Sequence, residues 1–152
     1  MTWKELKKKV YRQDGSLRDI LVRGVTTGDW RRWVDFVNRH YRTEFAVGDS
    51  FRAEKIDFEA VLQYWRSDDG ECPTARIYLD DIAVHIIFAG EEVLEQDICP
   101  AEIRSYADHQ KLVGYLTAVS KLLDRAVLLT EENMSAPRET LLIVAGETVS
   151  FR

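Results

Sequence analysis

The sequence has little cysteine, little proline and no long apolar run. Its 152 residues include two cysteines and three prolines. Cys72 and Cys99 form no CxxC pair and have no histidine at metal-ligand spacing, so we expect free, reduced thiols. No apolar stretch approaches the ~20 residues that span a bilayer, and the opening MTWKELKKKV lacks an apolar signal region. We therefore expect a cytoplasmic protein that binds neither a metal nor a membrane.

Catalytic and cofactor motifs are missing as well. The sequence contains no GxSxG, HExxH, P-loop or GxGxxG pattern, and neither cysteine lies in a catalytic signature. It also has no internal repeat and no linker-like segment, and its length suits one ordinary domain. The prediction is a single domain over residues 1–152, with no cofactor and more in keeping with a binding protein than with an enzyme.

The charge is unevenly distributed. Residues 1–42 carry eleven Lys and Arg against five Asp and Glu, a net of +6, and residues 43–152 carry ten against twenty-one, a net of −11. The basic N-terminal part, with Lys4, Lys7, Lys8 and Lys9, invites comparison with nucleic-acid-binding proteins. No nucleic-acid-binding motif accompanies it, and the −11 remainder would repel a polyanion. A nucleic-acid partner is therefore not expected.

Apolar periodicity predicts three helices, over about residues 29–41, 57–66 and 106–125, with Thr27, Asp57 and Ser105 as candidate N-caps. A capping box at Thr2–Glu5 predicts a further short helical turn. Residues 10–12 and 17–22 are predicted to form a hairpin around Asp14-Gly15. Strands are also expected at residues 43–47, 126–130, 140–145 and 148–151, with a turn holding Asn133 and Pro137 between the second and third of these. Runs of strands with few helices favour an antiparallel α+β fold.

The clearest strand pattern is a three-stranded meander over about residues 75–99. A two-residue turn at Asp80-Asp81 pairs Ile77 with Val84. A three-residue loop, 90–92, then pairs Phe88 with Leu94, whereas a shorter loop would place Ile86 opposite Glu95. The longer loop gives one apolar face, on which Gln96 is the single polar residue. We expect this meander to pack against two or three of the helices.

The same registers place Arg76, His85 and Asp97 side by side on the other face of the meander, with neighbouring Cβ atoms ~4.5–5.5 Å apart. A carboxylate beside a histidine orients the imidazole and raises its pKa, which suits a general base or a ligand contact. An ordinary polar ladder on an exposed sheet face is the alternative. No nucleophile, metal ligand or glycine loop accompanies the row, which favours the ladder.

Seven acidic residues, broken by no Lys or Arg, form the larger feature: Asp80, Asp81, Glu91, Glu92, Glu95, Asp97 and Glu102. A solvated surface is one interpretation, and a recognition surface that steers a basic partner is the other. A metal site is not expected, because Asp80-Asp81 and Glu91-Glu92 lie at opposite ends of one strand, too far apart at ~3.3 Å per residue to share an ion.

Four segments resemble parts of the small stand-alone α+β proteins of bacteria, several of which are immunity proteins that neutralise polymorphic toxins. They are residues 77–84 (IYLDDIAV), 97–103 (DICPAEI), 127–133 (VLLTEEN) and 14–20 (DGSLRDI). The resemblance implies a non-enzymatic protein that covers a basic toxin domain. It carries no shared functional residues to this sequence.

The leading expectation is therefore a protein-binding protein of the immunity kind. Its partner-binding residues would be Asp80, Asp81, Glu91, Glu92, Glu95 and Asp97. The first alternative is a small enzyme or ligand-binding protein that uses the Arg76, His85 and Asp97 row. The second is a structural subunit of a homo-oligomer in which exposed Tyr78 and Ile87 are buried by another copy.

Overall fold

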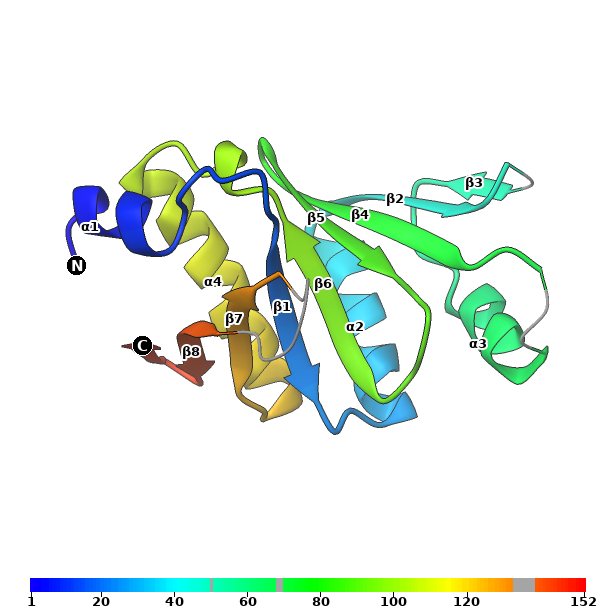
Figure 1. The fold of residues 1–152 in the computed structure, drawn as a ribbon. Coiled ribbons are helices and arrows are strands. Elements are labelled where there is room, and N and C mark those ends of the chain that lie inside the picture. Colours follow the sequence, from blue (N-terminus) through cyan, green and yellow to red (C-terminus); the bar gives the residue numbers. More distant parts are fainter. Residues whose placement is uncertain (50, 68–69, 133–138) are drawn as a thin grey trace.

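The computed structural model describes residues 1–49, 51–67, 70–132 and 139–152 (Figure 1). Over these residues all strands join one antiparallel sheet in the order β3-β2-β4-β5-β6-β1-β7-β8-β9, which confirms the α+β class. The strands are β1 (Arg18–Arg23), β2 (Arg42–Val47), β3 (Phe51–Ala53), β4 (Pro73–Leu79), β5 (Ile82–Ile87), β6 (Val93–Ile98), β7 (Val127–Glu131), β8 (Thr140–Ala145) and β9 (Thr148–Phe151).

The helices are α1 (Trp3–Lys9), α2 (Thr27–His40), α3 (Phe58–Ser67) and α4 (Tyr106–Leu123), with a short 3-10 helix at Pro100–Glu102. The capping box at Thr2 and Glu5 and the N-cap at Ser105 are confirmed. Thr27 was the wrong cap for α2. The cap is Thr26, because its hydroxyl accepts from the Asp29 backbone N–H while the Asp29 carboxylate accepts from the Thr26 N–H.

The predicted meander is confirmed in its registers. Ile77 pairs with Val84 and Arg76 with His85 across β4 and β5, and His85 pairs with Asp97 across β5 and β6. Asp80, in the tight turn, takes a left-handed φ of 54°, which aspartate tolerates better than most residues. The alternation of apolar and polar residues in the sequence therefore predicted this part of the sheet correctly.

The predicted N-terminal hairpin is wrong. Residues 10–12 follow α1 directly and form no strand, since Val10 ends that helix and Tyr11 turns into the core with 1% of its surface exposed. β1 instead lies between β6 and β7, with Ile20 opposite both Gln96 and Leu129. The pairing of β1 with two later strands buries both of its edges, which a local hairpin would not do. The expected turn at Asn133 and Pro137 lies outside the described residues.

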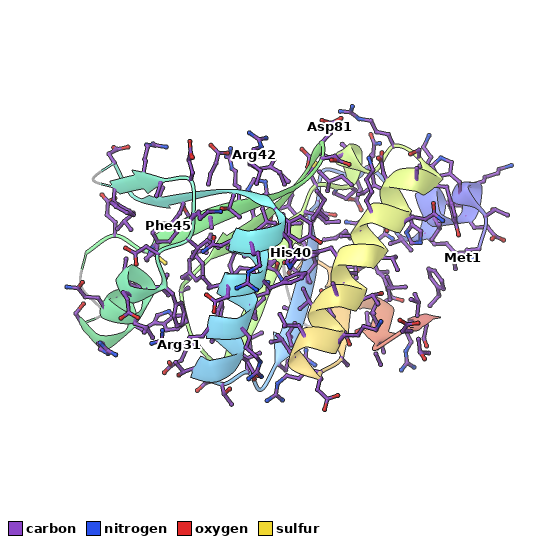
Figure 2. All side chains as sticks on the ribbon, turned by 180° about the vertical axis from the view of Figure 1, so that it is seen from behind. Met1, Arg31, His40, Arg42, Phe45 and Asp81 are labelled. Atoms are coloured by element: carbon purple, nitrogen blue, oxygen red, sulfur yellow. The ribbon has the colours of Figure 1, made fainter. Side chains whose placement is uncertain are left out.

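Helices α2 and α4 cover one face of the sheet, and α1 and α3 lie at the two ends of this helical layer (Figures 1 and 2). The core between the layers is rich in aromatic side chains. Trp30 and Trp33 of α2 are 1% and 0% exposed and pack against Phe88 at ring-centroid distances of 5.8 and 6.4 Å. Trp65 is half-buried and its ring lies 5.1 Å from that of Trp30. The tryptophans are core residues, as their spacing predicted.

Candidate functional site

The face of the sheet opposite the helices carries a polar row that crosses six strands. Backbone pairing aligns the row in the order Glu44, Arg76, His85, Asp97, Asp19 and Thr130. No helix of the described residues packs over this face (Figure 1). We call its section on β2, β4, β5 and β6 the helix-free face, defined by Glu44, Arg76, Tyr78, His85, Ile87, Glu95 and Asp97. On β1, by contrast, Asp19 and Leu21 of the same side are buried.

The three residues predicted to form a row do lie together. His85 and Asp97 are half-buried and Arg76 is exposed. Burial raises the pKa of Asp97, and the neighbouring His85 lowers it in part. Within the described part of the chain no hydrogen bond or ion pair joins these side chains, and His85 lines none of five pockets of 330–480 Å³. The geometry is that of a sheet face and offers no enclosed reaction site.

Apolar groups interrupt the charges on the helix-free face. Ile87 has 61% of its surface exposed, the highest fraction among the large hydrophobic residues identified as exposed. Tyr78 is half-buried, donates its hydroxyl to Glu44, and carries the Arg42 guanidinium 4.0 Å above its ring centroid. Tyrosine and arginine are enriched among the anchors of protein interfaces, and the half-buried Tyr78 with Arg42 over its ring lies on the same face as the exposed Ile87.

The acidic residues occupy three places rather than one. At one end of the meander, Asp80 forms an ion pair with Lys111 at 3.2 Å and Glu102 accepts from the Ala83 backbone N–H at 3.0 Å. Asp81 lies at the tip of the same turn (Figure 2). Glu91 and Glu92 are exposed at the opposite end, in a loop fixed by a 2.8 Å bond from the Trp30 indole N–H to the Glu91 carbonyl. Glu95 and Asp97 lie between these ends, on the helix-free face.

The helices have a net positive charge, although 11 of the 21 Lys and Arg lie outside them. Together the four helices contain ten Lys and Arg against five Asp and Glu, a net of +5. Since the whole chain has a net charge of −5, the remaining residues have a net charge of −10. The sequence boundary at residue 42 therefore approximates a spatial difference between a basic helical layer and an acidic remainder.

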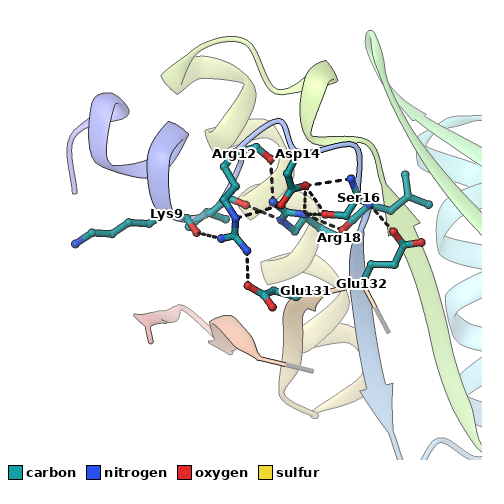
Figure 3. A network of polar contacts seen from close by, with 9 residues as sticks. Lys9, Arg12, Asp14, Ser16, Arg18, Glu131 and Glu132 are labelled. Carbon is teal, nitrogen blue, oxygen red and sulfur yellow. Dashed lines mark hydrogen bonds and ion pairs between the residues drawn. The ribbon is translucent and has the colours of Figure 1, made fainter. Parts of the chain in front are cut away.

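A buried cation that was not predicted from the sequence, Arg18, lies beneath the N-terminal segment (Figure 3). Arg18 is 0% exposed, and its guanidinium donates to the carbonyls of Val10, Arg12 and Leu17 at 2.7, 3.0 and 2.9 Å and to the Ser16 hydroxyl at 2.8 Å. Hydrogen bonds from Ser16, assisted by Arg18, lower the pKa of Asp14 to about 2. The network holds residues 10–17 against β1 and is structural.

Other site types find no support in the described part of the chain. It contains no group of three or more His, Cys, Asp or Glu residues placed to hold a metal ion. Cys72 and Cys99 are free and half-buried. None of the described helices is both long and apolar enough to cross a membrane. Comparison with protein-family models, with curated proteins and with solved structures gives no match for this chain.

Proposed function

We propose that this chain is a non-enzymatic protein-binding protein of the immunity kind, which takes a basic toxin domain on its helix-free face. The observation that carries the proposal is the composition of that face, where Ile87 is exposed on β5, Glu95 and Asp97 lie on the adjacent β6, and Glu44 lies on β2 beyond β4. The carboxylates would steer a basic partner toward the sheet, and Ile87 and Tyr78 would supply apolar contacts once it is bound.

Two features of the fold support this proposal. The helix-free face is backed by a well-packed aromatic core, so a partner would meet a rigid platform that needs no ordering on binding. The helices have a net positive charge, most of it on α1, whereas the residues outside the helices have a net negative charge. A basic partner approaching the helices would meet like charge, so the charge distribution favours the sheet side.

The experiment is co-expression of this chain with the product of each adjacent gene, with cell growth as the readout. We expect one neighbour to be toxic alone and harmless with this chain. Binding of the purified pair, followed by calorimetry, should weaken as the salt concentration rises. Glu95→Lys should weaken binding at least tenfold, and Ile87→Ala should do the same through lost apolar contact.

Asp97→Asn tests the charge of the face without threatening the fold. Burial raises the pKa of Asp97, so its charge is less favourable in the folded chain than in water, and an amide of the same shape should be tolerated while binding weakens. The matched control is Asp35→Lys, since Asp35 is an exposed carboxylate on α2 and faces away from the sheet. Equal effects of Asp35→Lys and Glu95→Lys, or no toxic neighbour, would contradict the proposal.

The homo-oligomer alternative rests on the same exposed Ile87. It is distinguished by the mass in solution, measured by light scattering at low and high salt. A dimer that persists at high salt and dissociates in the Ile87→Asp variant would show that the helix-free face binds a second copy of this chain and not a toxin. A monomer under both conditions leaves the helix-free face open to another protein.

A further inference from the structure

A buried histidine, His109, lies in the helical layer and takes no part in the proposed function. His109 of α4 is 5% exposed, and its Nδ1 lies 2.7 Å from the hydroxyl oxygen of Tyr11. Tyr11 is itself 1% exposed. The imidazole ring also lies near Tyr106 and Phe151, with centroid distances of 5.6 and 6.3 Å. Three aromatic rings, those of Tyr11, Tyr106 and Phe151, thus hold the imidazole in place.

We assign the Tyr11 hydroxyl as the donor in this hydrogen bond, and the assignment places the imidazole proton. Burial raises the pKa of Tyr11, so its hydroxyl keeps its proton, and among the described residues Nδ1 is the one acceptor for that proton. Burial also lowers the pKa of His109, which favours the neutral ring. A neutral ring that accepts at Nδ1 must carry its proton on Nε2. No described residue accepts a hydrogen bond from this Nε2–H.

A pocket of about 440 Å³ lies beside His109, between α1, α4 and β9. Most of its lining is apolar or aromatic, and no Asp, Glu, Lys or Arg side chain contributes to it. The polar contributors besides His109 are the Gln110 amide and Met1, whose ammonium group also lowers the pKa of His109. The pocket lining includes Leu6, Tyr106, His109, Val113, Val149 and Phe151. The volume lies within the range of small-molecule sites, which are mainly apolar with few polar groups. His109 supplies one such polar group.

Gly114 adds space where a side chain would be expected. It lies within the 18-residue α4, and a Cβ placed on it would meet no atom within 4 Å. Glycine destabilises a helix interior relative to alanine, and here neither a positive φ nor a close contact requires it. Its place in the pocket wall enlarges the opening.

We propose that this pocket binds a small uncharged molecule with an apolar body and one hydrogen-bond acceptor, such as a carbonyl oxygen, which receives the Nε2–H of His109. The apolar wall takes the body of the ligand. The Nε2–H of His109 favours a ligand with an acceptor oxygen, because a ligand without one would fill the pocket and leave this N–H unpaired. This site is separate from the helix-free face and acts independently of the proposed function.

The test uses three probes of similar shape with the full chain: acetophenone, ethylbenzene and benzoate. Binding is measured by NMR titration of the His109 ring and of the Val113 and Val149 methyl groups. We expect acetophenone to shift these signals and to bind about tenfold more tightly than ethylbenzene, the difference that one hydrogen bond makes. Benzoate should bind more weakly than acetophenone, because a carboxylate loses more hydration than a ketone does on entering a mainly apolar pocket.

The double variant Tyr11→Phe with His109→Leu removes both hydrogen-bonding partners together, so neither is left unpaired in the core. It should bind acetophenone no better than ethylbenzene, with the ethylbenzene affinity unchanged. Val113→Phe, which fills the pocket, should abolish binding of both. Unchanged acetophenone affinity in the double variant, benzoate binding equal to acetophenone binding, or shifts remote from His109 would each overturn the proposal.

Discussion

Of the eight polar residues buried among the described residues, three find their partners in different ways. Arg18 donates to backbone carbonyls, and His109 accepts a hydrogen bond from the Tyr11 hydroxyl. Gln96, the single polar residue predicted for the core face of the meander, accepts from the hydroxyl of buried Tyr115, which in turn accepts from the Trp33 indole N–H at 3.1 Å. Periodicity places such residues on a face, but their partners come from distant segments and cannot be read from spacing.

His109 gives a pH dependence of stability with a definite sign. Its folded pKa is lowered, first by burial and second by the N-terminal ammonium group, whereas the unfolded value is about 6.5. The unfolded chain therefore binds a proton more readily as the pH falls below about 6.5, and the free energy of unfolding decreases there. We expect the full contribution above this pH and a progressive loss below it.

Urea denaturation between pH 8 and pH 5.5 measures this effect. The double variant Tyr11→Phe with His109→Leu should lose less stability over that interval than the wild-type chain. Carboxylates titrate in both proteins, so the difference between the two profiles isolates the histidine. Parallel profiles would show that His109 is not held neutral in the folded state.

At the level of elements, the sequence located most helices and strands but failed where a strand needed distant partners. The meander and the helices followed from burial periodicity and caps, which are local signals. The segment at residues 10–17 also carried a local signal, an Asp-Gly turn between apolar residues, yet it forms no hairpin. The hydrogen bonds from Arg18 to the carbonyls of Val10, Arg12 and Leu17 replace those that a hairpin would have made.

Arg18→Met should therefore destabilise the chain strongly. The methionine keeps the apolar stem but leaves the three carbonyls without their donor, and we expect a loss of about 3 kcal/mol in the free energy of unfolding. Arg12→Ala is the control, because this arginine is 42% exposed and its ion pairs with Asp14 and Glu131 should contribute about 1 kcal/mol or less. Chemical denaturation measures both, and similar losses would contradict the structural role of Arg18.

For the whole molecule, the charge difference between residues 1–42 and 43–152 was visible in the sequence, but the positions of the charged side chains on the folded surface were not. The sequence placed the acidic cluster around the meander and already separated Asp80-Asp81 from Glu91-Glu92 at opposite ends of one strand. In the fold the seven carboxylates separate into two ends and a face, and two of them, Asp80 and Glu102, are engaged by Lys111 and a backbone N–H. Because strand pairing sends alternate residues to opposite faces, closeness in sequence does not make one surface.

A single hydrophobic cluster extends from Leu6 to Val144, so we expect the chain to unfold as one unit. Three of the four tryptophans, Trp30, Trp33 and Trp65, lie around α2 and α3, so tryptophan fluorescence reports mainly on this side, whereas far-UV circular dichroism reports on all helices and strands. The two denaturation curves should coincide with one midpoint. Separate midpoints would mean that the α2–α3 side and the β7–β9 side unfold independently, against the prediction of a single domain.

The place of β1 in the sheet also matters while the protein is being made. This strand is the first to leave the ribosome, yet its two neighbours, β6 and β7, are translated much later. Until then its apolar residues, Ile20, Leu21 and Val22, have no strand on either edge. A nascent chain of this fold thus carries its central strand unpaired through most of its synthesis, and this is the segment that a chaperone would be expected to hold.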